Sequence, residues 1–372
     1  MKLKIKKNIL MEALNNVSKA IDTKNLIPIL SGIKFNVQKD KVVLTASDND
    51  ITIETVIEKG EYVEISSTGS IVIKGKYLID IVRKLESEFI NIEIIDDHKI
   101  MIYTENSEFN LNGIDSKEYP NIDLSLKDDF ITLKNEEVKN MILQTNYATS
   151  NDEARVVLTG INIKTNKDML EVSATDSYRL SSKKIKLDNK VSKDIDIIVP
   201  SKNISELYKV LPSDNDENIN IHIFDNKIIF EFDNIIFQSR LINGSYPNTK
   251  NLIPEDKLFD ITFNKTEFYN MIDRASILNS DSENNIITLE IANNLLKITS
   301  LSYEIGKVEE KAEINTKENI KISFSSRYML DALKTIRSEN VVITFVGEIK
   351  PILLKEENND DLIELILPIR TY

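Results

Sequence analysis

One sequence pattern recurs along the 372 residues of this chain. The motif ILSGI, with Gly32, returns as VLTGI, with Gly160, and Asp48 in TASDND returns as Asp176 in SATDSY, both at a shift of 128 residues. YPN returns at a shift of 127, and the segments GKYLIDIVRKL, SKNISELYKVL and SRYMLDALKTI follow one another at shifts of 126 and 125. Similar shifts at independent landmarks indicate a repeated structural unit. We therefore predict three domains: residues 1–125, 126–252 and 253–372.

Each repeat has the same pattern of hydrophobic periodicity. A helical period comes first, alternating strands follow, and a second helix precedes another set of alternating strands. We place an N-cap at Asn135 and hairpin turns at 39–40, 166–167 and 293–294. The fold class predicted is α+β, with three strand-rich domains that each hold two helices. The expected first helices are 6–21, 134–148 and 264–278, and the expected second helices are 74–85, 201–211 and 325–337.

Composition narrows the class of protein. Hydrophobic residues make up 41% and charged residues 29%, with no cysteine, so disulfides and thiolate metal sites are excluded. No apolar run approaches the length that spans a membrane, and the first residues do not resemble a signal peptide. These features fit a reducing, cytoplasmic compartment. His98 and His222 stand alone in strand and turn contexts, which favours a structural or an exposed histidine over a catalytic one.

The distribution of charge is more informative than its sum. A net charge of −13 taken alone argues against a nucleic-acid partner. However, the six helical segments hold 16 basic and 8 acidic residues, a net charge of +8, which leaves −21 for the rest of the chain. One explanation of the basic helices is that lysine suits any exposed helix face. The alternative is that the helices together face a polyanion, because contact with phosphates needs only a basic surface.

The segment SATDSYRL, residues 173–180, raises the question of an active site. Ser177 has no histidine nearby in sequence to act as a base, and Asp176 offers a single carboxylate where a metal would need several. The segment suits binding better: Thr175, Tyr178 and Leu180 would form an apolar wall and Arg179 a charged rim. We therefore predict no catalytic residue and no metal ligand in this segment.

Four motifs together identify a family resemblance. NLIPILSGI, SATDSYRL, FQSRLINGSYPN and the C-terminal LILPIRTY, on this threefold repeat, closely resemble the bacterial β sliding clamps, the processivity subunits of DNA polymerase III. The resemblance covers the whole chain. It implies a DNA-clamp architecture in which each chain forms half of a six-domain ring. The ring would be a head-to-tail homodimer with helices lining the hole, through which duplex DNA passes independently of sequence.

The resemblance also implies partners and the residues that meet them. A clamp loader, the replicative polymerase and repair proteins would dock by short linear motifs, with no enzymatic activity and no cofactor in the chain itself. The family often has an aromatic residue where Thr249 stands and a basic one where Asn251 stands, and Lys250 lies between them. The partner-peptide site carried over is Leu158, Thr175, Ser177, Tyr178, Arg179, Leu180, Pro247, Asn251, Leu252, Leu365, Leu367, Pro368, Ile369 and Arg370.

Two further sets of residues follow from the resemblance. Lys24 and Lys76 match family positions that touch DNA, and Lys202 and Arg327 are the repeat equivalents of Lys76. Phe109 and Leu111 of one chain would pack against Ile277 and Leu278 of the other at the dimer seam. A peptide-binding scaffold of three repeats without a DNA partner is the alternative, and a closed dimeric ring would distinguish the two.

Overall fold

A computed structural model describes residues 1–21, 27–188, 191, 193–279, 285–302 and 304–370. The chain divides into two compact units, residues 1–138 with 202–241, and residues 139–201 with 242–372. Lys24 lies outside the described residues. None of the helices in these described segments has the length and apolar character needed to cross a membrane.

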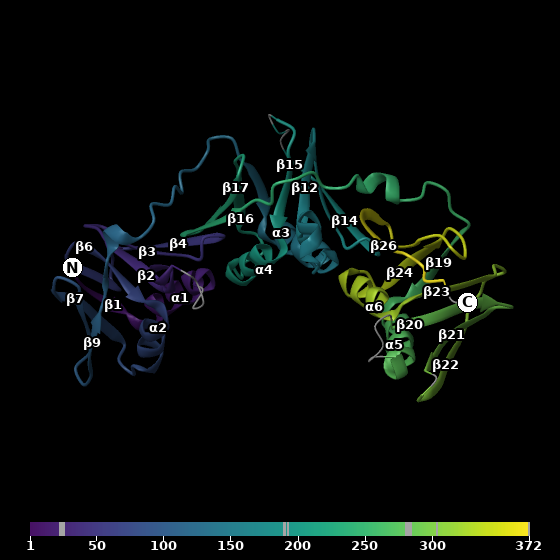
Figure 1. Ribbon diagram of the computed structural model, residues 1–372, viewed down its shortest axis with the longest axis horizontal. Coiled ribbons are helices and arrows are strands. Elements are labelled where there is room, and N and C mark those ends of the chain that lie inside the picture. The colour runs from purple at the N-terminus through teal and green to yellow at the C-terminus, as the bar shows by residue number, and fades with distance from the viewer. Residues whose placement is uncertain (22–26, 189–190, 192, 280–284, 303, 371–372) are drawn as a thin grey trace. The chain divides into compact units, whose positions relative to one another are not determined.

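The first unit contains two antiparallel sheets (Figure 1). The five-stranded sheet has the order β5 (Val63–Ser67), β1 (Lys2–Lys6), β7 (Phe89–Asp96), β8 (Lys99–Tyr103) and β9 (Glu108–Asn112). The nine-stranded sheet has the order β10 (Ile114–Asp115), β6 (Gly69–Lys74), β2 (Gly32–Val37), β3 (Lys41–Ser47), β4 (Ile51–Glu58), β18 (Ile235–Arg240), β17 (Lys227–Phe232), β16 (Asn218–Ile223) and β11 (Ile131–Lys134).

Helices of the first unit are short and amphipathic. Helix α1 (Lys7–Val17) packs against α2 (Gly75–Lys84) and against β3 and β4, and α4 (Ser201–Val210) follows the second repeat's strands. In α2, Leu78 and Val82 are buried while Lys76 and Arg83 are exposed. This spacing of three to four residues between buried positions is what lets one helix face join the core. The predicted second helix at 74–85 is therefore confirmed.

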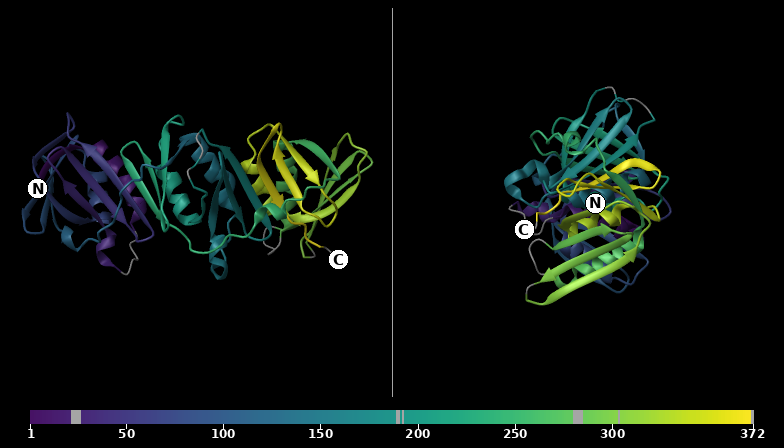
Figure 2. Two further views of the ribbon diagram at one scale, coloured as in Figure 1. Left: turned by 90° about the horizontal axis from the view of Figure 1, so that it is seen from above. Right: turned by 90° about the vertical axis from the view of Figure 1, so that its right-hand side faces the viewer.

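The second unit contains an eight-stranded and a four-stranded sheet, both antiparallel. Figure 2 shows from above how the teal strands of the second repeat and the yellow strands of the third belong to one sheet. Its order is β15 (Asp196–Pro200), β12 (Gly160–Asn166), β13 (Met169–Thr175), β14 (Arg179–Lys186), β26 (Asn359–Ile366), β25 (Ile352–Glu356), β24 (Asn340–Phe345) and β19 (Phe259–Asn264). The smaller sheet has the order β22 (Gly306–Glu313), β21 (Leu295–Ser302), β20 (Ile286–Ala292) and β23 (Ile320–Ser325).

Two helices of the second unit pack side by side over a shared apolar core. Helix α5 (Lys265–Ser276) contacts β19 to β22, and α6 (Ser326–Thr335) contacts β23 and β26. Phe268, Phe324 and Met329 are among the fully buried side chains of this core. Helix α3 (Asn135–Thr145) begins in the first unit and ends in the second. All six predicted helices are thus confirmed as helical segments.

The recurring glycine of the repeat has a steric cause. A Cβ atom at Gly160 would lie 2.5 Å from the carbonyl oxygen of Val199 on the neighbouring strand β15. A Cβ atom at Gly32 would likewise lie 2.5 Å from Val72 on β6. Only glycine permits the two strands to approach this closely. The same strand contact is therefore built twice, once in the first repeat and once in the second.

Strand pairing joins successive repeats inside the chain. Strand β4 of the first repeat pairs with β18 of the second, and β14 of the second pairs with β26 of the third. Strand β22 of the third repeat is equivalent to β4 and β14, and strand β9 of the first repeat is equivalent to β18 and β26. Each of these two strands lies at the end of its sheet. Among the described residues, these two strands therefore keep a free hydrogen-bonding edge where their counterparts have partners.

Two local predictions were wrong. Asn135 lies inside α3, and its side-chain amide donates to the carbonyls of Pro212 at 2.8 Å and Asp214 at 2.6 Å, so it is not an N-cap. The cap is made instead by Glu137, which accepts from the Lys134 N–H at 2.8 Å. The turn expected at 166–167 lies one residue later, because Asn166 still pairs with Met169.

Candidate partner-binding and nucleic-acid surfaces

The turn at residues 175–179 presents an aromatic side chain to solvent. Asp176 ends the strand, and its Oδ1 accepts from the N–H groups of Tyr178 at 2.9 Å and Arg179 at 3.0 Å. Ser177 adopts a left-handed backbone with φ of +81°, and its N–H donates to Thr175 Oγ1 at 3.1 Å. This tight side-chain-stabilised turn leaves the Tyr178 side chain 59% exposed. The carboxylate therefore acts as a structural support for the turn.

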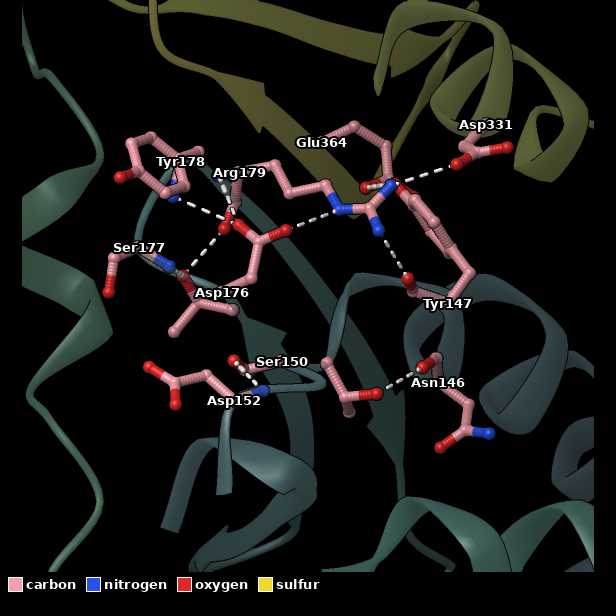
Figure 3. A network of polar contacts seen from close by, with 12 residues as sticks. Asn146, Tyr147, Ser150, Asp152, Asp176, Ser177, Tyr178, Arg179, Asp331 and Glu364 are labelled. Carbon is pink, nitrogen blue, oxygen red and sulfur yellow. Dashed lines mark hydrogen bonds and ion pairs between the residues drawn. The ribbon is translucent and has the colours of Figure 1, made fainter. Parts of the chain in front are cut away.

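Arg179 does not form the charged rim that the sequence predicted. Its side chain is only 9% exposed, and its guanidinium group is held on three sides (Figure 3). Nε donates to Asp176 Oδ2 at 3.0 Å and Nη1 to Asp331 Oδ2 at 2.9 Å, while Nη2 donates to the Tyr147 carbonyl at 2.8 Å. The guanidinium carbon also lies 5.0 Å from the ring centre of Tyr147 and 4.6 Å from that of Tyr328. A group so enclosed is not available at a rim.

A buried carboxyl lies next to this arginine. Glu364 on β26 is fully buried, and burial raises its pKa to about 8. Its Oε1 lies 3.1 Å from Ser181 Oγ and 2.8 Å from Thr335 Oγ1, but each hydroxyl also has a backbone carbonyl to donate to, at 2.6 and 2.7 Å. A hydroxyl carries only one proton. A proton on Glu364 completes the network, since it can donate to one of the two hydroxyl oxygens.

The C-terminal segment lies alongside the turn. The Leu367 N–H donates to the Tyr178 carbonyl at 2.9 Å, and the Ile369 N–H donates to Ser323 at 2.7 Å. Leu367 is 37% exposed and Pro368 is half-buried, so this segment adds apolar surface next to Tyr178. Arg370 is exposed at the end of the described chain. The fold therefore joins the 175–180 and 365–370 parts of the predicted site.

The remaining predicted residues divide between two apolar clusters. Leu158 packs with Ile198 and Tyr246, and the Tyr246 hydroxyl accepts from the Thr175 N–H at 3.0 Å. Leu180 is 1% exposed and packs with Leu353 and Leu365, so it is a core residue beneath the surface.

The residues that follow Tyr246 lie on the surface. Pro247 and Asn251 are exposed, and Leu252 is 47% exposed beside them in the short segment η6 (Thr249–Leu252). Lys250 in the same segment lies 3.7 Å from Glu171, so this ion pair partly neutralises the positive charge of Lys250.

Two exposed residues were missed by the sequence reading. Val156 is 54% exposed, and Arg155 donates to Ser177 Oγ at 2.8 Å, so the segment η5 (Glu153–Thr159) adjoins the turn. The only sequence signal was the pair of valines just before Gly160. Among the described residues no group of three His, Asp or Glu side chains is placed to hold a metal ion.

Basic residues occupy one repeated position on the second helices. Lys76, Lys202 and Arg327 lie in the first turns of α2, α4 and α6, and all three are exposed. None of them forms an ion pair with another described residue. The last turns differ, because one basic residue in each pairs with an acid three residues earlier: Asp80–Arg83 at 3.3 Å, Glu206–Lys209 at 2.7 Å and Asp331–Lys334 at 3.4 Å.

Comparison with known proteins decides the family. The three domains described as DNA polymerase III beta subunit N-terminal, central and C-terminal match residues 1–123, 132–248 and 250–370. The chain is 42% identical to the beta sliding clamp of Staphylococcus epidermidis over 378 residues, covering all of both chains. The chain belongs to the DNA polymerase III beta subunit family, the sliding clamps.

Solved sliding clamps share the whole fold. The sliding clamp of Bacillus subtilis has a TM-score of 0.96 at 39% identity, with all of both chains covered. A sliding clamp of Pseudomonas aeruginosa, solved bound to griselimycin, has a TM-score of 0.93 at 23% identity over all of both chains. At that lower identity the likeness concerns the fold.

The predicted seam residues of this sliding clamp lie on edge strand β9 and in a short helix that contacts edge strand β22. Phe109 is 38% exposed and Leu111 is half-buried on β9. Ile277 is 65% exposed and Leu278 is half-buried in the short helix η7 (Ile277–Asn279), which contacts β21 and β22. Each pair therefore belongs to an edge region that has apolar side chains at its surface.

One histidine is buried and the other is exposed. His222 is buried, and its ring lies 5.0 Å from the ring of Phe130, with Nε2 3.3 Å from Glu231. His98 is half exposed and its nearest acid, Asp115, is 3.9 Å away.

Proposed function

We propose that this sliding clamp closes as a head-to-tail homodimeric ring around duplex DNA. In that role it tethers the replicative polymerase and offers a docking surface to the clamp loader and to repair proteins. It needs no cofactor and carries out no reaction, because its task is to remain linked to DNA while partners act.

The free edges of β9 and β22 carry this proposal. Two of the three equivalent repeat junctions are closed within the chain by β4–β18 and β14–β26 pairing. The third would be closed by β22 of one chain and β9 of another. A head-to-tail contact of this kind forms a ring when its rotation closes. With three repeats in each chain, two chains would supply six domains and six equivalent junctions.

The existing junctions predict the register of the third. Phe237 pairs with Ile53 at the first junction, and Glu364 lies opposite Ser181 at the second. Following the strand pairing within each repeat, Phe109 takes the place of Phe237 and Val308 takes the place of Ile53, so Phe109 would lie opposite Val308 of the second chain. Both are apolar, and they lie near the exposed Ile277 of η7. Asn110 would then lie opposite Lys307, on the other face of the sheet.

Cysteine cross-linking tests this register directly, because the chain has no cysteine of its own. Residues directly opposite each other in antiparallel strands have Cα atoms about 4.5–5.5 Å apart, which suits a disulfide. Asn110→Cys with Lys307→Cys should give a covalent dimer under mild oxidation. Asn110→Cys with Val308→Cys is the control, since its side chains would point to opposite faces. A monomeric mass for the native protein at micromolar concentration would favour the scaffold alternative.

The free cations of the second helices support the DNA-encircling part. Lys76, Lys202 and Arg327 recur at one helix position and have no acidic partner among the described residues. Such side chains are available to phosphates without reading base sequence. A ring holds DNA by topology, so these contacts can each be weak. The protein should stay on closed circular DNA and leave the same DNA after it is linearised.

The surface around Tyr178 supports the docking part. Tyr178 and Leu367 expose apolar side chains next to each other at the ends of strands β14 and β26, and Leu252 is exposed in η6. Exposed aromatic and leucine side chains of this kind suit a short peptide with aliphatic or aromatic anchors. Griselimycin is a suitable probe, because a clamp of the same fold has been solved with it bound. We expect it to bind here in competition with partner peptides.

A further inference from the structure

The two junctions inside the chain differ in chemistry although their strand pairing is equivalent. The first is uncharged, with Ile51 and Ile53 on β4 and Phe237 on β18 all buried beside the small polar side chains Thr52 and Ser239. The second is polar, with Arg179 and Ser181 on β14 in the same places and Glu364 in place of the phenylalanine. Two repeats can thus be joined without a buried charge. The polar groups of the second junction call for a separate explanation.

Arg179 joins three different parts of the second unit (Figure 3). It is bound to Asp176, which supports the exposed Tyr178 through two backbone N–H groups. It is bound to the carbonyl of Tyr147 in the short helix η4 (Asn146–Ala148). It is also bound to Asp331 and stacked on Tyr328, both of α6. The position of α6 therefore bears directly on the turn that presents Tyr178.

Asp331 is shared between this junction and the basic face of its helix. Its Oδ2 accepts from Arg179 at 2.9 Å, and its Oδ1 lies 3.4 Å from Lys334. The equivalent acids are Asp80 of α2 and Glu206 of α4. Each also pairs with a basic residue one turn later, Asp80 with Arg83 and Glu206 with Lys209. Neither of them pairs with a second arginine among the described residues. Within that described part of the chain, only α6 links its surface charges to a junction.

We propose that Arg179 is a positioning residue that couples the partner surface to the DNA-facing side of α6 through Asp331. This inference rests on the proposed function, because that function assigns partner peptides to one surface and DNA to the other. Arg179 itself touches neither ligand. It holds the Asp176 turn, and hence Tyr178, in one geometry.

The sign of the coupling follows from the sharing of Asp331. When Lys334 turns to a DNA phosphate, the Asp331 carboxylate is left to Arg179 alone. The ion pair with Arg179 then strengthens, because the carboxylate no longer divides its charge between two cations. DNA should therefore make the Tyr178 turn more rigid and tighten partner binding. By thermodynamic linkage, a bound partner must tighten DNA contact by the same factor.

Hydrogen exchange at the Tyr178 and Arg179 amides tests the link without any ligand. In the full-length protein, Asp331→Asn should speed exchange of these two amides by about tenfold, because it weakens the hold on Arg179, which in turn anchors Asp176. Glu206→Gln is the matched control on α4 and should leave them unchanged. Equal exchange in Asp331→Asn and the native protein would overturn the proposal, whatever the clamp binds.

Ligand titrations then test the coupling. With griselimycin as the probe, Asp331→Asn should bind about tenfold more weakly than the native protein, a change of about 1.4 kcal/mol, and Glu206→Gln should bind like the native protein. A short duplex at low salt should slow exchange of the two amides in the native protein and have no such effect in Asp331→Asn. A duplex effect that persists in Asp331→Asn, or is absent from the native protein, would overturn the coupling. Failure of the native protein to bind griselimycin would instead count against the docking surface, while the exchange result still decides the link.

Discussion

The Tyr147 hydroxyl donates to the carboxyl group of Glu364 at 2.5 Å, in the fully buried junction between β14 and β26. Burial is the main cause that raises the pKa of Glu364 to about 8, against an ordinary value of 4.5. Between these two pH values the folded chain holds a proton that the unfolded chain has released. The free energy of unfolding is therefore greatest below pH 4.5 with respect to this group, and it decreases as the pH rises toward 8.

Glu364→Gln should remove that pH dependence. One fully coupled proton changes the free energy of unfolding by up to about 1.4 kcal/mol per pH unit. Glutamine keeps the shape and an N–H donor but does not ionise, so its stability should change less between pH 5 and pH 8. Urea unfolding at several pH values measures the effect. Glu290→Gln, on the exposed side of β20, is the control, and equal slopes in all three proteins would contradict the assignment.

The arrangement of the sheets could be predicted from the sequence only in part. The landmarks Gly32 and Gly160 revealed the repeat because close strand approach demands the same residue twice. The helices were recoverable because Leu78 and Val82 follow helical spacing. The role of Arg179 was not recoverable, because its partner Asp331 is 152 residues away and nothing local in SATDSYRL distinguishes a buried arginine from an exposed one. The N-cap prediction at Asn135 was wrong for a similar reason, because the carbonyl groups that its side chain binds lie in the distant 212–214 segment.

Replacing Ile277 and Leu278 together by alanine should separate the proposed dimer. Each aliphatic side chain buried at the seam contributes roughly 1.5–3 kcal/mol. Because Ile277 is 65% exposed in the single chain, its removal should leave the fold intact while weakening association. Sedimentation at micromolar concentration should show monomers. Ile349→Ala removes an equally exposed isoleucine, at 63%, from a hairpin loop and should leave the dimer unchanged.

Changing Lys76, Lys202 and Arg327 to glutamate should weaken the binding of duplex DNA. For every phosphate that the protein no longer neutralises, the slope of log affinity against log salt should become shallower by about 1. Lys59, Lys317 and Lys350 are exposed lysines outside the helices, and their triple change to glutamate alters net charge equally. If both triple variants showed the same affinity and salt slope, the helices would have no special part in DNA binding. Retention on closed circles at high salt should survive in either case.

Docking should depend on Tyr178 and on the residues that follow Ile366. Leu180→Ala is a poor test because the side chain packs in the core beside Leu353, where truncation costs about 2–5 kcal/mol of stability. Tyr178→Ala instead removes an exposed anchor, and a truncation after Ile366 removes Leu367 together with its hydrogen bond to the Tyr178 carbonyl.

Each of these two variants should lower griselimycin affinity by more than about tenfold, in the range of interface hot spots, as measured by calorimetry. Both should keep the native dimer mass, since neither touches β9 or β22. Tyr62→Ala, which removes a tyrosine 41% exposed in the first unit, is the control for general surface effects. Native affinity in the truncated dimer would place the docking surface elsewhere, whereas loss in both variants with normal Tyr62→Ala binding would assign it to the Tyr178 turn and the C-terminal segment.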